Sequence, residues 1–108
     1  MGSTRLHRMP SPKELEREKK IDAENVLFER KMPGTVDAFK FRKALEKLNC
    51  YYVGRHAVGD HVTMAREDEI TGETHRTSVL TAGEVKRGTY QGQLKALYIS
   101  FYKFLEVY

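Results

Sequence analysis

The clearest pattern of apolar and polar positions lies between residues 37 and 48. Apolar residues there recur at i, i+3, i+4 and i+7, and they are Phe41, Ala44, Leu45 and Leu48. We predict an amphipathic helix that begins at Thr35 or Asp37. Another face of this helix carries Lys40, Lys43 and Lys47. These lysines fit either a solvated helix face or a surface that meets phosphate groups.

Segments rich in β-branched and aromatic residues follow this helix. They cover residues 50–57, 61–66 and 74–80. Val58-Gly59-Asp60 and Thr71-Gly72 supply turn signals between them. We predict an antiparallel three-stranded sheet, followed by a loop over residues 81–87.

Two further helical patterns close the chain. Thr89 is the predicted cap of the first helix, which places Tyr90, Leu94 and Leu97 on one face. Ser100 is the predicted cap of a last short helix. The apolar residues of that helix again have helical spacing, and they are Phe101, Phe104, Leu105 and Tyr108. Both apolar faces are expected to close the core.

The first 34 residues are predicted to be organised differently. Residues 1–10 are expected to be disordered, and Ser11-Pro12-Lys13-Glu14 has the pattern of a capping box with proline at the first helical position. We therefore predict a helical arm within residues 11–34. The apolar residues Val26-Leu27-Phe28 indicate that the end of this arm packs on another surface. Residues 35–108 are predicted to form one α+β domain with the order helix, three-stranded antiparallel sheet, helix and short C-terminal helix.

Composition limits the choice of function. The chain has 108 residues, 40% hydrophobic and 31% charged, which suits one small core. A formal net charge of +4 fits a polyanionic partner as well as a merely soluble surface. The single cysteine, Cys50, and the scattered histidines lack metal-ligand spacing, so no metal and no cofactor are expected. Because no signal peptide or long apolar run is present, we expect a cytoplasmic protein without a membrane span.

Gly59-Asp60-His61 places a histidine at the start of the second predicted strand. A histidine in this position can act as a general acid or base near neutral pH. It equally fits a residue that faces solvent or bonds to a neighbouring strand. His75 has no comparable motif and is expected to be a surface residue.

Several of these motifs share the spacing of a known family. They are the helix Phe41-Arg42-Lys43-Ala44-Leu45-Glu46-Lys47-Leu48, the Gly59-Asp60-His61 strand start, the Gly88-Thr89-Tyr90 helix start with Leu94, and the closing Ser100-Phe101-Tyr102-Lys103-Phe104-Leu105-Glu106. With them, residues 35–108 resemble the HicA toxins of HicA/HicB toxin–antitoxin systems, which are small mRNA interferases with a double-stranded-RNA-binding-domain-like fold. Asp60 stands in place of that family's usual serine, and Tyr98 in place of a helix-ending glycine.

The resemblance implies a metal-independent endoribonuclease in which His61 is catalytic. RNA contains its own nucleophile, the 2′-hydroxyl, so a positioned imidazole and nearby cations supply the chemistry. Lys86 and Arg87 precede the expected helix start at Gly88-Thr89, where backbone N–H groups favour phosphate. The full set of candidate RNA contacts is Lys40, Lys43, Lys47, Arg55, His56, Lys86, Arg87 and Lys95.

The partners that this resemblance implies are mRNA and an inhibitory HicB-like antitoxin protein. Two other interpretations stay open. In the first, the domain is a noncatalytic nucleic-acid-binding protein with the same fold. In the second, it is a protein-interaction module that works through its arm. In the second case the arm covers the sheet, binds a second copy of the chain, or occupies the groove of an antitoxin.

Overall fold

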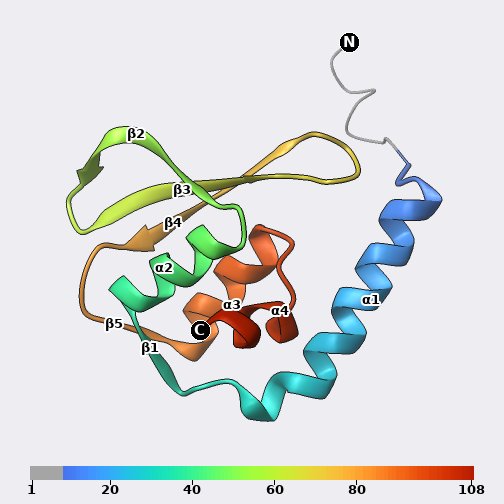
Figure 1. Cartoon of the computed structure of the whole chain (residues 1–108), viewed down its shortest axis with the longest axis horizontal. Coiled ribbons are helices and arrows are strands. Elements are labelled where there is room, and N and C mark those ends of the chain that lie inside the picture. The colour runs from blue at the N-terminus through green and yellow to red at the C-terminus, as the bar shows by residue number, and fades with distance from the viewer. Residues whose placement is uncertain (1–8) are drawn as a thin grey trace.

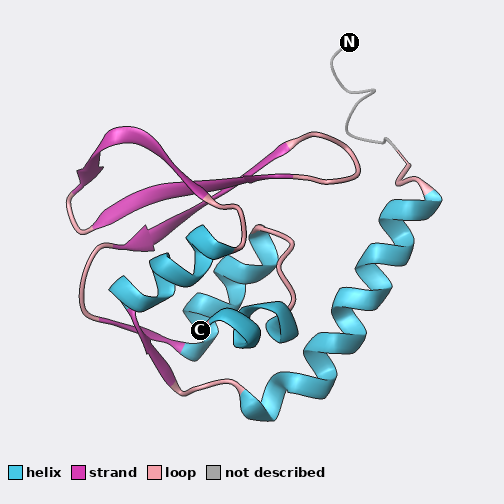
Figure 2. Cartoon of the chain, viewed as in Figure 1, coloured by secondary structure: helices cyan, strands magenta, loops and turns pink. Residues whose placement is uncertain are grey.

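The computed structural model of the chain describes residues 9–108, apart from the side chains of residues 55–58. The prediction of disorder for residues 1–10 therefore lies, up to residue 8, outside the described residues. Figure 2 shows the helices and strands of the chain. In chain order they are α1 (Pro12–Phe28), the 3₁₀ turn η2 (Glu29–Lys31), β1 (Thr35–Asp37), α2 (Ala38–Lys47), β2 (Tyr51–Val58), β3 (His61–Glu67), β4 (Thr74–Leu80), β5 (Glu84–Lys86), α3 (Arg87–Ala96) and α4 (Phe101–Val107).

The strands form an antiparallel sheet of three strands in the order β2-β3-β4 and a second sheet of two strands, β1 and β5. The predicted α+β class and three-stranded sheet are thus confirmed. Of the two predicted starts of the second helix, Asp37 is confirmed as the N-cap of α2, whereas Thr35 begins a strand. The expected loop over residues 81–87 was wrong in part, because it contains β5. Strands of three residues are too short to show a periodicity in the sequence, and these two are stabilised by pairing with each other and by burying Val36 and Val85 in the core.

The core lies between the three-stranded sheet and the helices α2, α3 and α4 (Figure 1). The predicted inner faces of α2 and α3 are confirmed, since Phe41 and Tyr90 are fully buried with their ring centroids 6.0 Å apart. Phe104 of α4 completes this group, at 5.6 Å from Phe41. Tyr108 differs from prediction because it is 43% exposed, and its ring stacks on the outer side of Phe104.

Caps explain where most helices begin. The capping box of α1 is confirmed, as the Glu14 N–H donates to Ser11 Oγ at 3.2 Å and the Ser11 N–H to Glu14 Oε1 at 2.9 Å. Ser100 caps α4 by accepting from the Lys103 N–H. Thr89 does not cap α3, which begins earlier at Arg87 and has no side-chain cap. The pairing of β5 with β1 already orients the chain there.

The predicted arm is α1, and it packs along α4 rather than over the three-stranded sheet (Figure 1). Near its end, Phe28 packs on Tyr102 with the ring centroids 5.0 Å apart, and Asn25 Oδ1 accepts from the Phe101 N–H at 2.9 Å. Val26 and Leu27, also expected to pack, are 79% and 72% exposed. Among the described helices none has the length and apolar character needed to cross a membrane.

Candidate functional site

His61 is the first residue of β3 and follows a tight turn made by Gly59 and Asp60. Gly59 has a φ of +62°, a conformation that glycine adopts without steric cost. The backbone of His61 pairs with Val58 on one side and Leu80 on the other. Its side chain is exposed, and within the described part of the chain its ring makes no hydrogen bond or ion pair. The imidazole is thus accessible to a ligand.

Thr81 connects the turn before His61 to helix α2. Its N–H donates to the carbonyl oxygen of Asp60 at 2.8 Å, and its own carbonyl oxygen accepts from Arg42 Nη2 at 2.7 Å. Arg42 therefore holds the chain next to His61 against α2. Sequence reasoning did not single out Arg42 as a site residue, because nothing near it in the sequence indicates that it reaches the end of β4.

Arg42 also belongs to a group of aromatic and cationic side chains that we call the Phe39 cluster, made of Phe39, Arg42, Lys43 and Tyr52. The Arg42 guanidinium carbon lies 5.6 Å and the Lys43 Nζ 5.3 Å from the centroid of the Phe39 ring. Arg42 Nη1 donates to the Tyr52 hydroxyl at 2.9 Å, and that hydroxyl donates to Glu46 at 2.8 Å. Burial and the bond to Glu46 raise the pKa of Tyr52, so its hydroxyl remains a donor at neutral pH.

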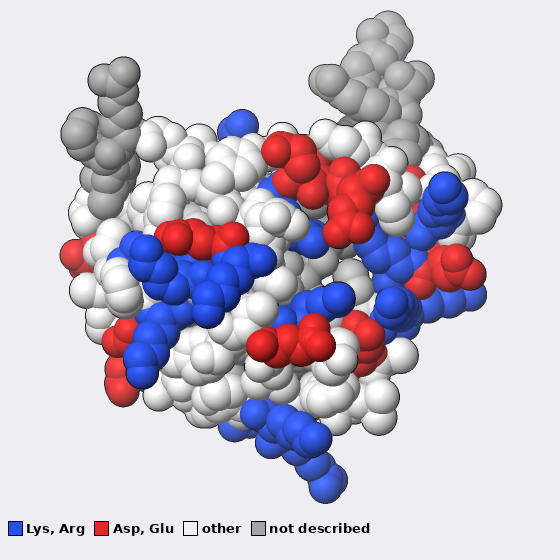
Figure 3. All heavy atoms as spheres, viewed as in Figure 1, with Lys and Arg blue, Asp and Glu red and all other residues white. Residues whose placement is uncertain are grey.

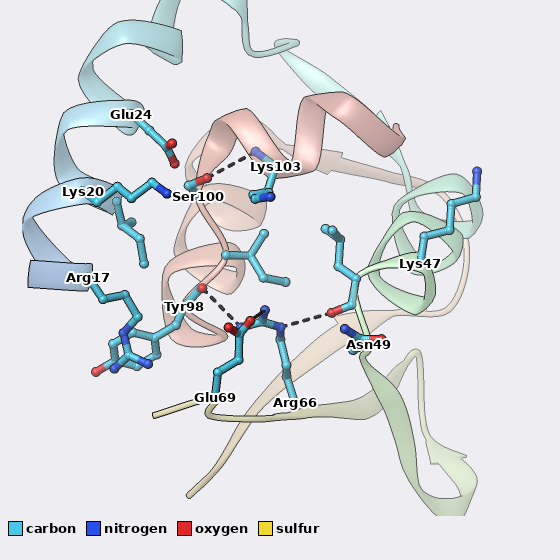
Figure 4. Close-up of a pocket in the computed structure, with 13 residues that line it drawn as sticks. Arg17, Lys20, Glu24, Lys47, Asn49, Arg66, Glu69, Tyr98, Ser100 and Lys103 are labelled. Atoms are coloured by element: carbon cyan, nitrogen blue, oxygen red, sulfur yellow. Dashed lines mark hydrogen bonds and ion pairs between the residues drawn. The ribbon is translucent and has the colours of Figure 1, made fainter. Parts of the chain in front are cut away.

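The predicted basic face of α2 is present at the surface. Lys40, Lys43 and Lys47 are all exposed, and Figure 3 shows Lys and Arg side chains gathered over α2. Lys43 Nζ lies 3.5 Å from Glu46 Oε1, an exposed pair that contributes little. Lys47 is at the far end of the helix, and Figure 4 shows it extending away from Arg66 and Tyr98. Of the three lysines, Lys43 thus belongs to the Phe39 cluster, and Lys40 directly follows Phe39 in the same helix.

Lys86 and Arg87 lie at the junction of β5 and α3, and both are exposed. Arg87 is already engaged, since its N–H donates to the Gly34 carbonyl at 2.9 Å and its Nε to the Pro33 carbonyl at 3.3 Å. The helix that was expected to begin at Gly88-Thr89 thus begins one residue earlier, at Arg87. Its first backbone N–H is bonded to the Gly34 carbonyl oxygen. Lys86 keeps a solvent-facing side chain.

The other candidate contacts are not brought together with these residues. Lys95 is eight residues beyond Arg87, about 12 Å along the helix axis. It lines a hollow next to Asp22 and Asn25 of α1. The side chains of Arg55 and His56 lie outside the described residues, so their predicted contacts stay predictions.

A buried carboxylate, missed at the level of sequence, joins the arm to the domain. Asp68, in the turn after β3, accepts from Arg17 Nη1 at 2.6 Å, from the Ile70 and Thr71 N–H groups, and pairs with His75 Nε2 at 2.8 Å. Burial alone raises its pKa, but these hydrogen bonds hold the pKa of Asp68 well below the usual range. His75, expected at the surface, is instead mostly buried in this arrangement.

A hollow of about 300 Å³ lies between α1, the end of α2 and the corner before α4 (Figure 4). Its two arginines bind other parts of the fold, since Arg17 pairs with Asp68 and Arg66 donates to the carbonyl oxygens of Leu48 and Leu97. Arg66 thereby satisfies the C-terminal ends of α2 and α3. The hollow is thus mainly a structural junction. Among the described residues no group of three His, Cys, Asp or Glu side chains could hold a metal ion.

No family model, curated protein or solved structure matches the chain. The candidate site is therefore defined by its own geometry: an exposed His61, the Thr81 bridge to Arg42, and the Phe39 cluster with Lys40 alongside.

Proposed function

We propose that this chain is an RNA-binding endoribonuclease of the HicA type, an mRNA interferase in which His61 is the catalytic residue. The observation that supports the proposal most is the exposed imidazole of His61, which bonds to none of the described residues and follows a turn that Thr81 ties to α2. Thr81 thus links the turn that carries His61 to the helix that carries Lys40 and Lys43.

The chemistry asked of His61 is proton transfer. When the 2′-hydroxyl of RNA attacks the adjacent phosphorus, the hydroxyl loses a proton and the P–O5′ bond breaks as the 5′-oxygen gains one. An imidazole at this point can accept the first proton or donate the second. The products are a 2′,3′-cyclic phosphate and a 5′-hydroxyl. Lys40, Lys43 and Lys86 would hold the phosphates and balance the charge that develops.

The test is cleavage of labelled single-stranded and structured RNA by purified protein in the presence of EDTA. We expect the wild-type chain to cleave RNA and His61→Ala to cleave it at least about 100-fold more slowly. A loss of this size is usual when a general acid or base is removed. Lys19→Ala, at an exposed position on α1, is the matched control and keeps the wild-type rate. Equal cleavage by wild type and His61→Ala, or no cleavage by either, overturns the enzymatic proposal.

A noncatalytic nucleic-acid-binding protein is the second candidate, favoured by Asp60, whose carboxylate adjoins His61 in the sequence and repels a phosphodiester. Binding without cleavage should then weaken steeply as salt rises, and His61→Ala should bind like wild type. Lys40→Gln with Lys43→Gln should lower the slope of log K against log salt by about 0.7 for each lost phosphate contact. Lys13→Gln with Lys19→Gln, on α1, is the charge-matched control.

The proposed function also includes a protein partner, an inhibitory HicB-like antitoxin in the cytoplasm that covers His61. Expression in a bacterial host tests this part. Wild type should arrest growth, His61→Ala should not, and co-expression of the antitoxin should restore growth. Arrest by His61→Ala as strong as by wild type would separate any toxicity from the proposed chemistry.

A further inference from the structure

Phe39 is exposed on a helix whose inner face is already filled. Its side chain is 55% exposed, whereas Phe41, two residues later, is fully buried in the core. The remaining phenylalanines, Phe28, Phe101 and Phe104, are buried or half-buried. Packing of α2 therefore does not account for a large aromatic ring at position 39.

The surroundings of Phe39 are cationic and partly fixed. Arg42 and Lys43 both lie within 6 Å of the ring centroid. Arg42 cannot swing freely, because its two terminal nitrogens donate to Thr81 and Tyr52. The Arg42 guanidinium and the Lys43 ammonium lie over the Phe39 ring, so the cluster offers an aromatic side chain together with two positive charges, which favour an anionic ligand.

The same hydrogen bonds relate Phe39 to the candidate catalytic residue. Arg42 contacts the Thr81 carbonyl, Thr81 contacts the Asp60 carbonyl, and Asp60 precedes His61. These bonds connect the backbone of the turn before β3, through the segment after β4, to helix α2.

We propose that Phe39 and Arg42 form a stacking site for a base of the single-stranded RNA that the proposed endoribonuclease binds. This inference rests on the proposed function and names its substrate class. Unstacked bases of single-stranded RNA bind to aromatic rings and arginine planes, whereas in a duplex the faces of the bases are hidden. Lys40 and Lys43 contact the flanking phosphates.

The experiment measures affinity by fluorescence anisotropy with three labelled probes of equal length: single-stranded RNA, duplex RNA, and an abasic ribose-phosphate chain that keeps the phosphates. All proteins carry His61→Ala so that the RNA stays intact. Phe39→Ala and Phe39→Leu should weaken binding of single-stranded RNA by about 5- to 100-fold, as loss of one stacked base does. Phe39→Trp should retain it. Leu27→Ala, at an exposed apolar position on α1, should change nothing.

The duplex and abasic probes separate stacking from charge. Their affinities should change less than twofold in Phe39→Ala, because neither presents a free base face. Equal affinity of all Phe39 variants for single-stranded RNA overturns the stacking site while leaving cleavage by His61 intact. Equal weakening on all three probes also overturns it. If Phe39→Ala alters self-association but not RNA affinity, Phe39 is a protein-contact residue and the proposal is wrong. Failure of His61→Ala protein to bind any RNA overturns both proposals.

Discussion

Arg17 in α1 donates a 2.6 Å hydrogen bond to the carboxylate of Asp68, 51 residues further along the chain. The Arg17 guanidinium also lies 4.5 Å from the centroid of the Tyr98 ring, and the His75 ring lies 4.4 Å from the same centroid. Tyr98 has a φ of +57°, a conformation in which glycine usually ends a helix. Besides its packing on α4, the arm thus meets the domain at a buried polar and aromatic contact around Asp68 and Tyr98.

Removal of the Asp68 carboxylate should destabilise the protein strongly. Asp68→Ala leaves Arg17 and two backbone N–H groups without their acceptor in a site where the carboxylate is 1% exposed. We expect the free energy of unfolding to fall by about 3 kcal/mol, as when one partner of a buried pair is lost. Arg17→Met should cost less, about 1–2 kcal/mol, because Asp68 keeps its other donors.

Urea denaturation at neutral pH measures both, and Lys19→Ala serves as control. Equal stabilities of Arg17→Met and Lys19→Ala would contradict a stabilising role for this pair.

The same carboxylate predicts a dependence of stability on acid pH. Because the folded state holds the pKa of Asp68 below its unfolded value, near 4, the contribution is complete above about pH 5 and is lost as the pH falls below 4. The stability difference between wild type and Asp68→Asn should therefore be largest near pH 7 and shrink toward pH 2. Denaturation curves across this range test it, with Asp22→Asn on the exposed side of α1 as control. A difference that stays constant from pH 7 to pH 2 would refute the linkage.

Cys50 should be chemically inert in the folded protein. Its side chain is buried in the core, and burial raises the pKa of the thiol to about 11, so little thiolate is present at pH 8. Labelling with a thiol reagent should be at least tenfold slower in buffer than in denaturing urea. Rapid labelling of the folded chain would mean that the end of α2 opens readily.

Gly59→Ala should affect both stability and the candidate site. Nothing lies within 4 Å of an added Cβ, so the cost comes from the positive φ alone, about 1 kcal/mol. If the turn relaxes to relieve this strain, the backbone that positions His61 moves. We therefore expect cleavage to fall by more than the small loss in stability explains. Gly72→Ala, in the other hairpin at φ +78°, is the matched control and should lose stability without losing cleavage.

Local patterns predicted much of the fold. The helical spacing around Phe41 and the caps at Ser11 and Ser100 act between residues within one or two turns, and the structure contains all three. The β-rich segments likewise became β2, β3 and β4. The position of His61 at the start of a strand is confirmed, while its proposed chemistry stays a prediction.

What the sequence by itself determined is therefore the set of long helices and strands, because their signals are carried by neighbouring residues. Only the tertiary structure decided the pairing of β1 with β5, the bond from Arg42 to Thr81, and the burial of Asp68 with Arg17 and His75. In each of these the partners are distant in sequence. The sequence around a single arginine or aspartate does not show whether its side chain faces solvent or binds a partner. Long-range packing decided between these cases, and it links α2 to the turn that precedes His61.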